Sequence, residues 1–217
     1  MTKHVIATII LWGSIGSGWA QLQLTQLTIN DSTIHTIPRY TWQAPLYKTF
    51  RIFNTHGLDL SVAVGGHIRN HGLIYDLGPD RYKHRIISIG PAFKIPIIIA
   101  KKISLTVGYG LNYPIHYKEK VLKDRMRKNK SVTVSEWLSK RTVRWHPHVM
   151  VKIGMIRGIT VEAEVFPQNF FNTNYAEPDE MGGNQYPYQG WSARIVNVDI
   201  GFQWLDPNKK PTYYEDE

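Results

Sequence analysis

The chain has 217 residues, a formal net charge of +9 and no cysteine. This length suits one domain, and the absence of cysteine excludes disulfides, thiol catalysis and metal sites built on thiolates. The basic surplus suits an anionic partner, such as nucleic acid or the phosphates of lipids and polysaccharides.

Residues 1–20 have the composition of a secretory signal peptide. Lys3 and His4 precede the apolar run Val5–Trp12, and small residues lead to Ala20, after which we expect cleavage. Glycine and serine interrupt this run well short of the roughly 20 residues that a membrane-anchoring helix needs. The mature chain then begins at Gln21 and is exported, so we expect its anionic partner to be lipid or polysaccharide and not nucleic acid.

Apolar and polar residues alternate in eight later segments, and this alternation predicts β-strands. The first is weak, because its alternation slips near Gln26, and the fourth contains Pro91 and Pro96, which we expect at bulges or non-pairing positions. In chain order, the segments are Gln21–Ile29, Leu46–Thr55, Leu58–Ile68, Lys83–Ile99, Ile103–Tyr113, Arg141–Ile153, Ile159–Phe166 and Trp191–Trp204.

The fifth segment, Ile103–Tyr113, has the clearest pattern. One face is entirely apolar and ends in tyrosine, and the other carries only small or polar residues. Its length matches the roughly 9–11 residues with which a tilted strand crosses a bilayer. A soluble lipocalin-like barrel would show the same alternation with the apolar face inward. Small residues on the polar faces and Tyr or Trp at strand ends favour the membrane orientation.

Connections between the strands alternate between long and short, and both termini fall at one end. We therefore predict an all-β fold, an eight-stranded antiparallel transmembrane β-barrel with short periplasmic turns and long external loops. The predicted barrel spans residues 21–204, and a polar tail covers residues 205–217.

This pattern resembles the small eight-stranded outer-membrane β-barrel proteins of Gram-negative bacteria. The segment Gly201–Trp204 looks like the terminal aromatic signal that the insertion machinery recognises in those proteins, although 13 residues follow it here. The resemblance implies an outer-membrane location, and we expect no cofactor. The tail is too short for a peptidoglycan-binding domain.

Charged residues on the inward faces predict a salt-bridged lumen. An eight-stranded barrel is only wide enough for side chains to fill it, and buried charges must be paired. We therefore expect a plug and no open pore. The expected members of this network are Arg51, Asp59, Lys94, Arg144, Lys152, Glu162, Glu164 and Asp199.

One hairpin suggests a metal site. If the strands around Ile156 pair symmetrically about it, His148 lies opposite Glu164. Residues two apart share a strand face, so a divalent ion such as zinc could bind His146, His148, Glu162 and Glu164. The alternative is that these side chains belong only to the polar lumen.

Two long connections differ in character. The connection Pro114–Lys140 is basic, and we expect it to face lipopolysaccharide phosphates unless it is merely a solvated loop. The connection Pro167–Gly190 is aromatic, which suits protein contact or an aromatic girdle. The cations of the basic connection are Lys118, Lys120, Lys123, Arg125, Arg127, Lys128 and Lys130.

The leading functional hypothesis is non-enzymatic: a structural or partner-binding barrel of the cell envelope, such as an accessory of a larger envelope or secretion assembly. Its expected partners are outer-membrane lipid, lipopolysaccharide and an envelope protein. One alternative is an enzyme that modifies lipid A, for which Ser61 and His67 share a strand face and Ser192 begins the last strand. A narrow channel is the other alternative.

Overall fold

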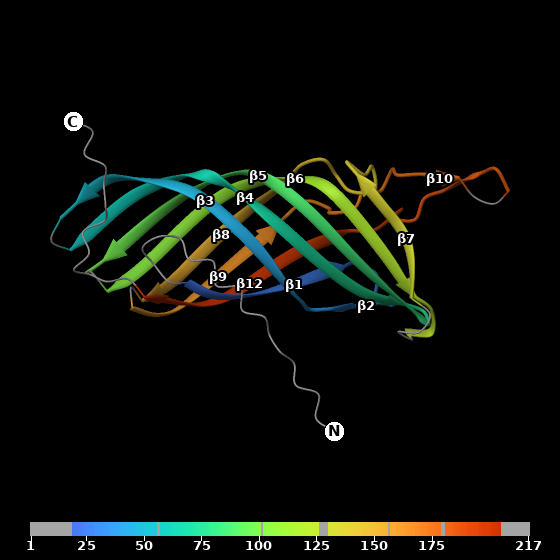
Figure 1. The fold of residues 1–217 in the computed structure, drawn as a ribbon, viewed down its shortest axis with the longest axis horizontal. Helices are drawn as coiled ribbons and strands as arrows, with labels where there is room; N and C mark the ends of the chain where they lie inside the picture. The colour runs from blue at the N-terminus through green and yellow to red at the C-terminus, as the bar shows by residue number, and fades with distance from the viewer. Residues whose placement is uncertain are drawn as a thin grey trace, which may run out of the picture.

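The computed structural model describes residues 19–55, 57–100, 102–125, 130–155, 157–178 and 181–204. The tail beyond residue 204 and the predicted signal peptide up to residue 18 lie outside these residues. The chain forms an elongated barrel of steeply tilted strands (Figure 1). Within the described ranges, no helix has the length and apolar character needed to cross a membrane.

The secondary structure is almost entirely strand, with one short 3-10 helix at Lys123–Arg125. The strands are β1 (Trp19–Ile29), β2 (Ile34–Ile37), β3 (Arg39–Asn54), β4 (Leu58–Leu77), β5 (Asp80–Ile99), β6 (Ile103–Leu122), β7 (Lys130–Trp137), β8 (His146–Met155), β9 (Arg157–Phe166), β10 (Glu177–Pro178), β11 (Asn184–Gln185) and β12 (Ala193–Trp204).

Antiparallel pairing closes a ring through β1, β3, β4, β5, β6, β8, β9 and β12, which pairs again with β1. This ring confirms the predicted eight-stranded barrel. The short turns after β3, β5 and β8 lie at the end where β1 begins and β12 ends, which is the periplasmic end in barrels of this type. β2 pairs with β4 and β7 pairs with β6 at the opposite, outer end.

Strands β4, β5 and β6 have 20 residues each. β4 and β6 extend far beyond their predicted ends at Ile68 and Tyr113, whereas β5 only begins slightly earlier than predicted, at Asp80. The loop predicted between Ile68 and Lys83 was wrong, because strand alternation continues and buries His71, Leu73 and Tyr75 inside. The chain reverses only at Gly78, whose φ of 58° is the left-handed conformation that a tight turn needs. One wall of the barrel therefore rises well above the others.

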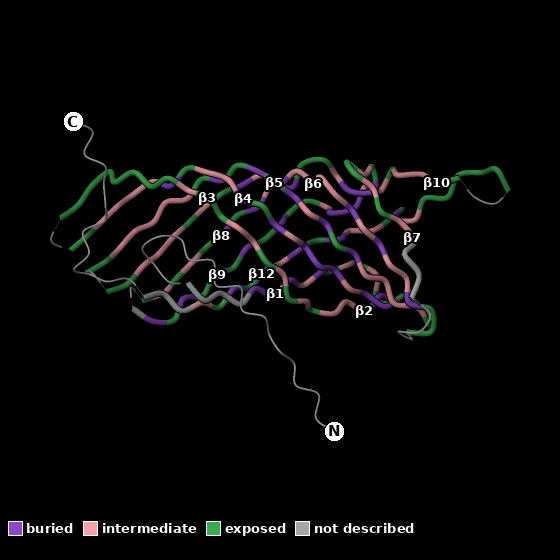
Figure 2. The backbone as a smooth tube through the Cα atoms, in the orientation of Figure 1, coloured by how far each residue is buried: buried purple, intermediate pink, exposed green. Residues whose placement is uncertain are grey.

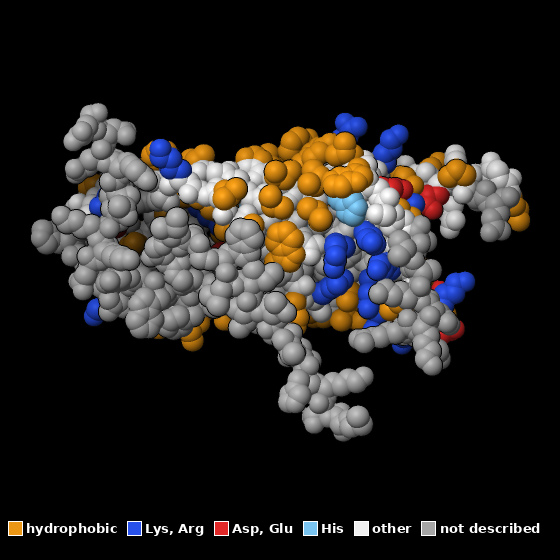
Figure 3. Space-filling view, viewed as in Figure 1, with side chains coloured by type: hydrophobic (Ala, Val, Ile, Leu, Met, Phe, Trp, Pro, Cys, Tyr) orange, Lys and Arg blue, Asp and Glu red, His pale blue; other side chains and the backbone are white. Residues whose placement is uncertain are grey.

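The outward face of the ring is an apolar belt. Its side chains are exposed although they are large and hydrophobic, and this is the surface that lipid covers on an outer-membrane barrel. Figure 3 shows the apolar side chains over the middle of the face in view. Members of the belt are Leu46, Phe50, Val64, Ile89, Phe93, Val107, Tyr109, Val149, Val151, Ile153, Ile159, Val161, Val165, Val198 and Ile200.

Both prolines of β5 lie where one of its ladders is interrupted. The β5–β6 ladder has no pair at Pro91, between Ile89 and Ala92, and the β4–β5 ladder has none at Pro96. Because proline cannot donate a backbone hydrogen bond, these are positions that a strand tolerates. The expectation of non-pairing positions is thus confirmed.

Gly90 of β5 marks a close approach of two backbones. A Cβ atom there would lie 1.6 Å from the carbonyl oxygen of Leu111 on β6. We expect Gly90→Ala to destabilise the barrel by at least ~1–3 kcal/mol, because a backbone must move. Gly57→Ala is the matched control, since nothing lies within 4 Å of its Cβ position. Urea unfolding of the detergent-folded variants measures both; equal stability of the two would contradict the expectation.

Candidate functional site

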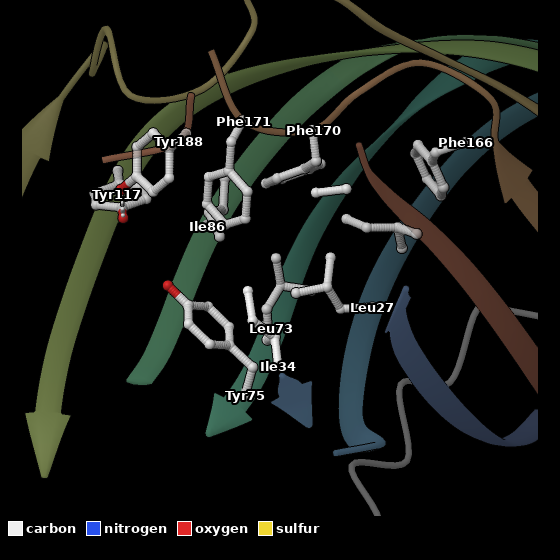
Figure 4. Close-up of a cluster of buried hydrophobic side chains, with 12 residues drawn as sticks. Leu27, Ile34, Leu73, Tyr75, Ile86, Tyr117, Phe166, Phe170, Phe171 and Tyr188 are labelled. Atoms are coloured by element: carbon white, nitrogen blue, oxygen red, sulfur yellow. Dashed lines mark hydrogen bonds between the residues drawn. The ribbon is translucent and has the colours of Figure 1, made fainter. Parts of the chain in front are cut away.

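Buried residues gather in the half of the barrel that lies nearer to β2 and β7 (Figure 2). The cause is the aromatic connection between β9 and β12, which folds into the barrel mouth. The rings of Phe171 and Tyr188 stack at a centroid distance of 4.6 Å, and Phe170 N donates to the carbonyl oxygen of Ala193 at 2.7 Å. These aromatic side chains point toward Ile86 and Leu73 on the opposite wall (Figure 4). They form a lid, defined here as Phe170, Phe171 and Tyr188.

A buried polar cluster adjoins the lid. Tyr117 Oη donates to Glu119 Oε2 at 2.7 Å and lies 3.0 Å from Tyr188 Oη. His84 Nδ1 lies 2.7 Å from the same Tyr117 oxygen, and its Nε2 lies 3.1 Å from Tyr75 Oη. Burial and then the charge of Glu119 raise the pKa of Tyr188 to about 12. Tyr188 therefore keeps its proton at neutral pH and fastens the lid to β6.

Four histidines, His67, His71, His146 and His148, form a layer beneath the lid. All four are buried, and the rings of His67 and His148 lie 5.3 Å apart. His148 stacks on Phe166 at 5.0 Å.

The predicted hairpin register was wrong, because Met150 and not His148 lies opposite Glu164. The ladder is shifted by two residues relative to pairing about Ile156, so His146 and His148 lie beside aromatic rings. Among the described residues, no group of three His, Asp or Glu side chains is placed to bind a metal ion. The proposed set of His146, His148, Glu162 and Glu164 is therefore not assembled.

A buried ion pair crosses the lumen at this level. Arg69 Nη2 lies 2.7 Å from Glu164 Oε1, and the two side chains are 2% and 1% exposed. Arg69 also donates to Gln43 Oε1 at 2.6 Å, and Asn197 Nδ2 donates to Glu164 Oε2 at 3.0 Å. Sequence reasoning missed Arg69, because it assigned this residue to a loop. The pair thus joins β4 to β9 across the lumen.

Further charges line the lumen toward the periplasmic end. Arg51 Nη2 lies 3.2 Å from Asp59 Oδ2, and Lys94 Nζ lies 3.9 Å from Glu162 Oε1. Asp199 accepts a hydrogen bond from Gln23, and Lys152 lies opposite Glu162 in the ladder. Arg144 departs from the prediction. It precedes β8, is exposed and lies on the outer wall, because the strand begins five residues later than expected, at His146.

The outer wall carries the predicted cations Lys118 and Lys120, which lie on β6 and not in a loop. Glu119 between them is buried inside, so both lysines face outward. Their ladder partners on β5 are Arg85 and Lys83, respectively. These four residues and Arg39 are called the basic wall.

Arg39 joins the basic wall from β3. A Cβ atom on Gly72 would lie 2.8 Å from its Cδ, so its side chain covers Gly72, the ladder partner of Arg85. Lys and Arg side chains gather beside the apolar belt on the face seen in Figure 3. The basic connection Pro114–Lys140, predicted as a loop, contains the hairpin of β6 and β7. The positive charge at the tip of this hairpin is partly neutralised, because Arg125 Nε lies 3.4 Å from Asp76 Oδ2. Lys123 is exposed at the tip, Lys130 begins β7, and Arg127 and Lys128 lie outside the described residues.

No protein-family model and no curated protein matches this chain. Two crystal structures of Ail, the attachment invasion locus protein of Yersinia pestis, are similar to it. One, in complex with the heparin analogue sucrose octasulfate, is 10% identical, covers 88% of this chain and 100% of Ail, and has a TM-score of 0.31. The other is 9% identical, covers 87% and 97%, and has a TM-score of 0.32. This likeness is too weak to support a functional argument, so the fold assignment rests on the strand pairings.

Proposed function

We propose that this chain is a non-enzymatic, non-conducting outer-membrane barrel that binds the phosphates of lipopolysaccharide through its basic wall. The observation that carries the proposal is the pairing of like charges on the outside of β5 and β6. Arg85 lies opposite Lys118, and Lys83 lies opposite Lys120. Like charges directly opposite each other destabilise a sheet, and an anionic partner would remove that cost.

The position of the basic wall supports lipopolysaccharide as this partner. The wall lies outward from the apolar belt, at the end with the long connections, where the phosphates of the outer leaflet lie. Lysine and arginine form short, charge-assisted hydrogen bonds with phosphate oxygens.

The lumen supports a non-conducting role. The lid closes the outer mouth, and the buried pair of Arg69 and Glu164 fills the middle. We expect no steady conductance from the detergent-folded protein in a planar bilayer, because ions would have to displace both layers. Ohmic channels of uniform size in many independent preparations would contradict the non-conducting role.

The arrangement of serine and histidine argues against the enzymatic alternative. His67 is buried and hydrogen-bonded to Asn112, and Ser61 donates to Asp59. His116 Nε2 does lie 3.3 Å from Ser135 Oγ, but its Nδ1 has no hydrogen-bond partner among the described residues. A serine nucleophile requires a histidine that a third group orients.

The double variant Arg85→Gln/Lys118→Gln tests the basic wall. Each cation near a charged membrane surface contributes about 1 kcal/mol, so losing two should weaken lipopolysaccharide binding about thirtyfold. Binding is measured on detergent-folded protein at low and high salt. The matched control is Lys48→Gln/Lys102→Gln, which removes two exposed lysines outside the basic wall, Lys48 opposite Val64 of the belt and Lys102 in the turn after β5. Unchanged binding by the wall variant would contradict the proposal.

A further inference from the structure

A groove of about 460 Å³ lies on the outer wall where β6 changes partners. β7 pairs with β6 as far as His116, and β8 takes over at Asn112. Between them, Tyr113 and Pro114 face the segment 138–144, which is not a strand, and this segment forms the other side of the groove.

The segment 138–144 is held firmly. Arg141 is buried, and its Nε lies 3.5 Å from Glu136 Oε1. Its carbonyl oxygen accepts a hydrogen bond from Asn172 N at 2.8 Å, and Val143 N donates to the carbonyl oxygen of Phe170 at 3.2 Å. The groove is therefore attached to the lid and has a preformed shape.

Three donors line this groove. Lys140 and Arg144 are exposed, and within the described part of the chain neither forms an ion pair. Thr142 is only 3% exposed, and its Oγ1 has no hydrogen-bond partner among the described residues. A buried hydroxyl without a partner is costly, and its place beside two cations indicates an anion that accepts hydrogen bonds.

The aromatic residues nearby place the groove at the level of lipid headgroups. The rings of Tyr113 and Trp145 lie 5.0 Å apart, and Trp145 and Trp137 are 51% and 73% exposed. Exposed tryptophan and tyrosine mark the membrane–water interface. Leu138, which is 59% exposed, adds an apolar surface to the same groove.

We propose that this groove binds one phosphorylated sugar headgroup of lipid A, the membrane-embedded part of lipopolysaccharide. The phosphate oxygens accept hydrogen bonds from Lys140, Arg144 and Thr142, and the sugar packs against Tyr113 and Leu138. This inference rests on the proposed function and adds a stoichiometric lipid site to it, distinct from the basic wall.

The donor set favours a phosphate monoester over the phosphodiester of a phospholipid. A monoester carries about −1.5 to −2 charges at neutral pH and three acceptor oxygens, which match two cations and one hydroxyl. A phosphodiester carries one charge and has only two free oxygens. We therefore expect phosphatidylglycerol to bind the groove much more weakly than lipid A.

Native mass spectrometry of the full, detergent-folded chain tests the site, with bisphosphorylated lipid A, its dephosphorylated form and phosphatidylglycerol as probes. We expect one retained bisphosphorylated lipid, and at least about tenfold weaker retention in Lys140→Gln/Arg144→Gln, since two charge-assisted contacts are lost. Equal retention by this variant, or equal binding of phosphatidylglycerol, would overturn the proposal. The control Lys48→Gln/Lys102→Gln, which lies outside both the groove and the basic wall, should behave as the unaltered chain.

Thr142→Val separates a lipid site from a structural role. The substitution removes a buried hydroxyl without a partner, so the lipid-free barrel should unfold at the same or a higher urea concentration. Lipid A retention should nevertheless fall. A variant that lost stability and kept its lipid would show that Thr142 serves only the fold.

The basic wall variant distinguishes the two proposals. Arg85→Gln/Lys118→Gln should reduce the salt-sensitive binding of lipopolysaccharide and leave the single retained lipid A in place. If the groove variants retain lipid A normally while the wall variant binds lipopolysaccharide more weakly, this inference fails and the proposed function stands. If the wall variant has no effect on binding, the proposed function fails.

Discussion

Replacing Glu164 with glutamine is expected to cost about 3–5 kcal/mol of barrel stability. The substitution removes one member of a buried ion pair and leaves the Arg69 guanidinium, 2% exposed, without its ion-pair partner. Removing a single partner of a buried pair is typically that costly. The introduced amide can still accept a hydrogen bond from Arg69, but this bond cannot replace the Coulomb attraction. Urea unfolding of the protein in detergent or lipid vesicles measures the loss.

A double replacement tests the cause. In Arg69→Met/Glu164→Leu neither charge of this pair stays buried, so much of the stability should return, as it does when apolar residues replace a buried pair elsewhere. Arg51→Met is the matched control. Its pair with Asp59 is partly exposed, at 33% and 19%, and exposed pairs contribute only about 0–1 kcal/mol. If Glu164→Gln cost no more than Arg51→Met, the lumen pair would not hold the barrel together.

The barrel itself could be predicted because lipid and lumen impose opposite chemistry on alternate residues. In β9, for example, Val161 and Val165 face outward while Glu162 and Glu164 face inward, as the sequence indicates. The ends of the strands could not be predicted in the same way. The polar run from Arg69 to Gly72 looked like a loop, but the strand continues there and its inward side chains Arg69 and His71 are buried.

The assumption of a polar lumen failed at the outer mouth. The alternation of β1 appeared to slip near Gln26, but Gln23, Thr25 and Leu27 all face inward in unbroken alternation. The inward residue becomes apolar at Leu27 because the lid lies there. A lid made by a distant connection leaves no local signal in β1, so this feature required the three-dimensional structure.

The candidate sites could likewise be predicted only in part from the sequence. Lys118 and Lys120 were found from the sequence as a local excess of charge, but their partners on β5 are more than 30 residues away in the chain and depend on register. The register of the β8–β9 ladder also determined whether the predicted metal ligands lie opposite one another. A shift of two residues placed Met150 opposite Glu164 and His148 beside the ring of Phe166.

Truncating the lid at Phe171→Ala is the second change with a large expected effect. Phe171 is fully buried, and its ring contacts Tyr188, Trp191 and His84. Removing a buried phenylalanine side chain typically costs about 3–5 kcal/mol. Tyr186→Ala is the control from the same connection, because Tyr186 is 44% exposed and should cost less than about 1 kcal/mol. Urea unfolding compares the two variants.

The same variant shows whether the lid alone closes the barrel. Without the Phe171 ring the outer mouth widens, but the ion pair of Arg69 and Glu164 still fills the level below. We therefore expect Phe171→Ala to be less stable and still non-conducting in a planar bilayer. Steady conductance in Phe171→Ala, absent from Tyr186→Ala, would mean that the lid is the only barrier to ions and that the deeper charges line a path instead of blocking one.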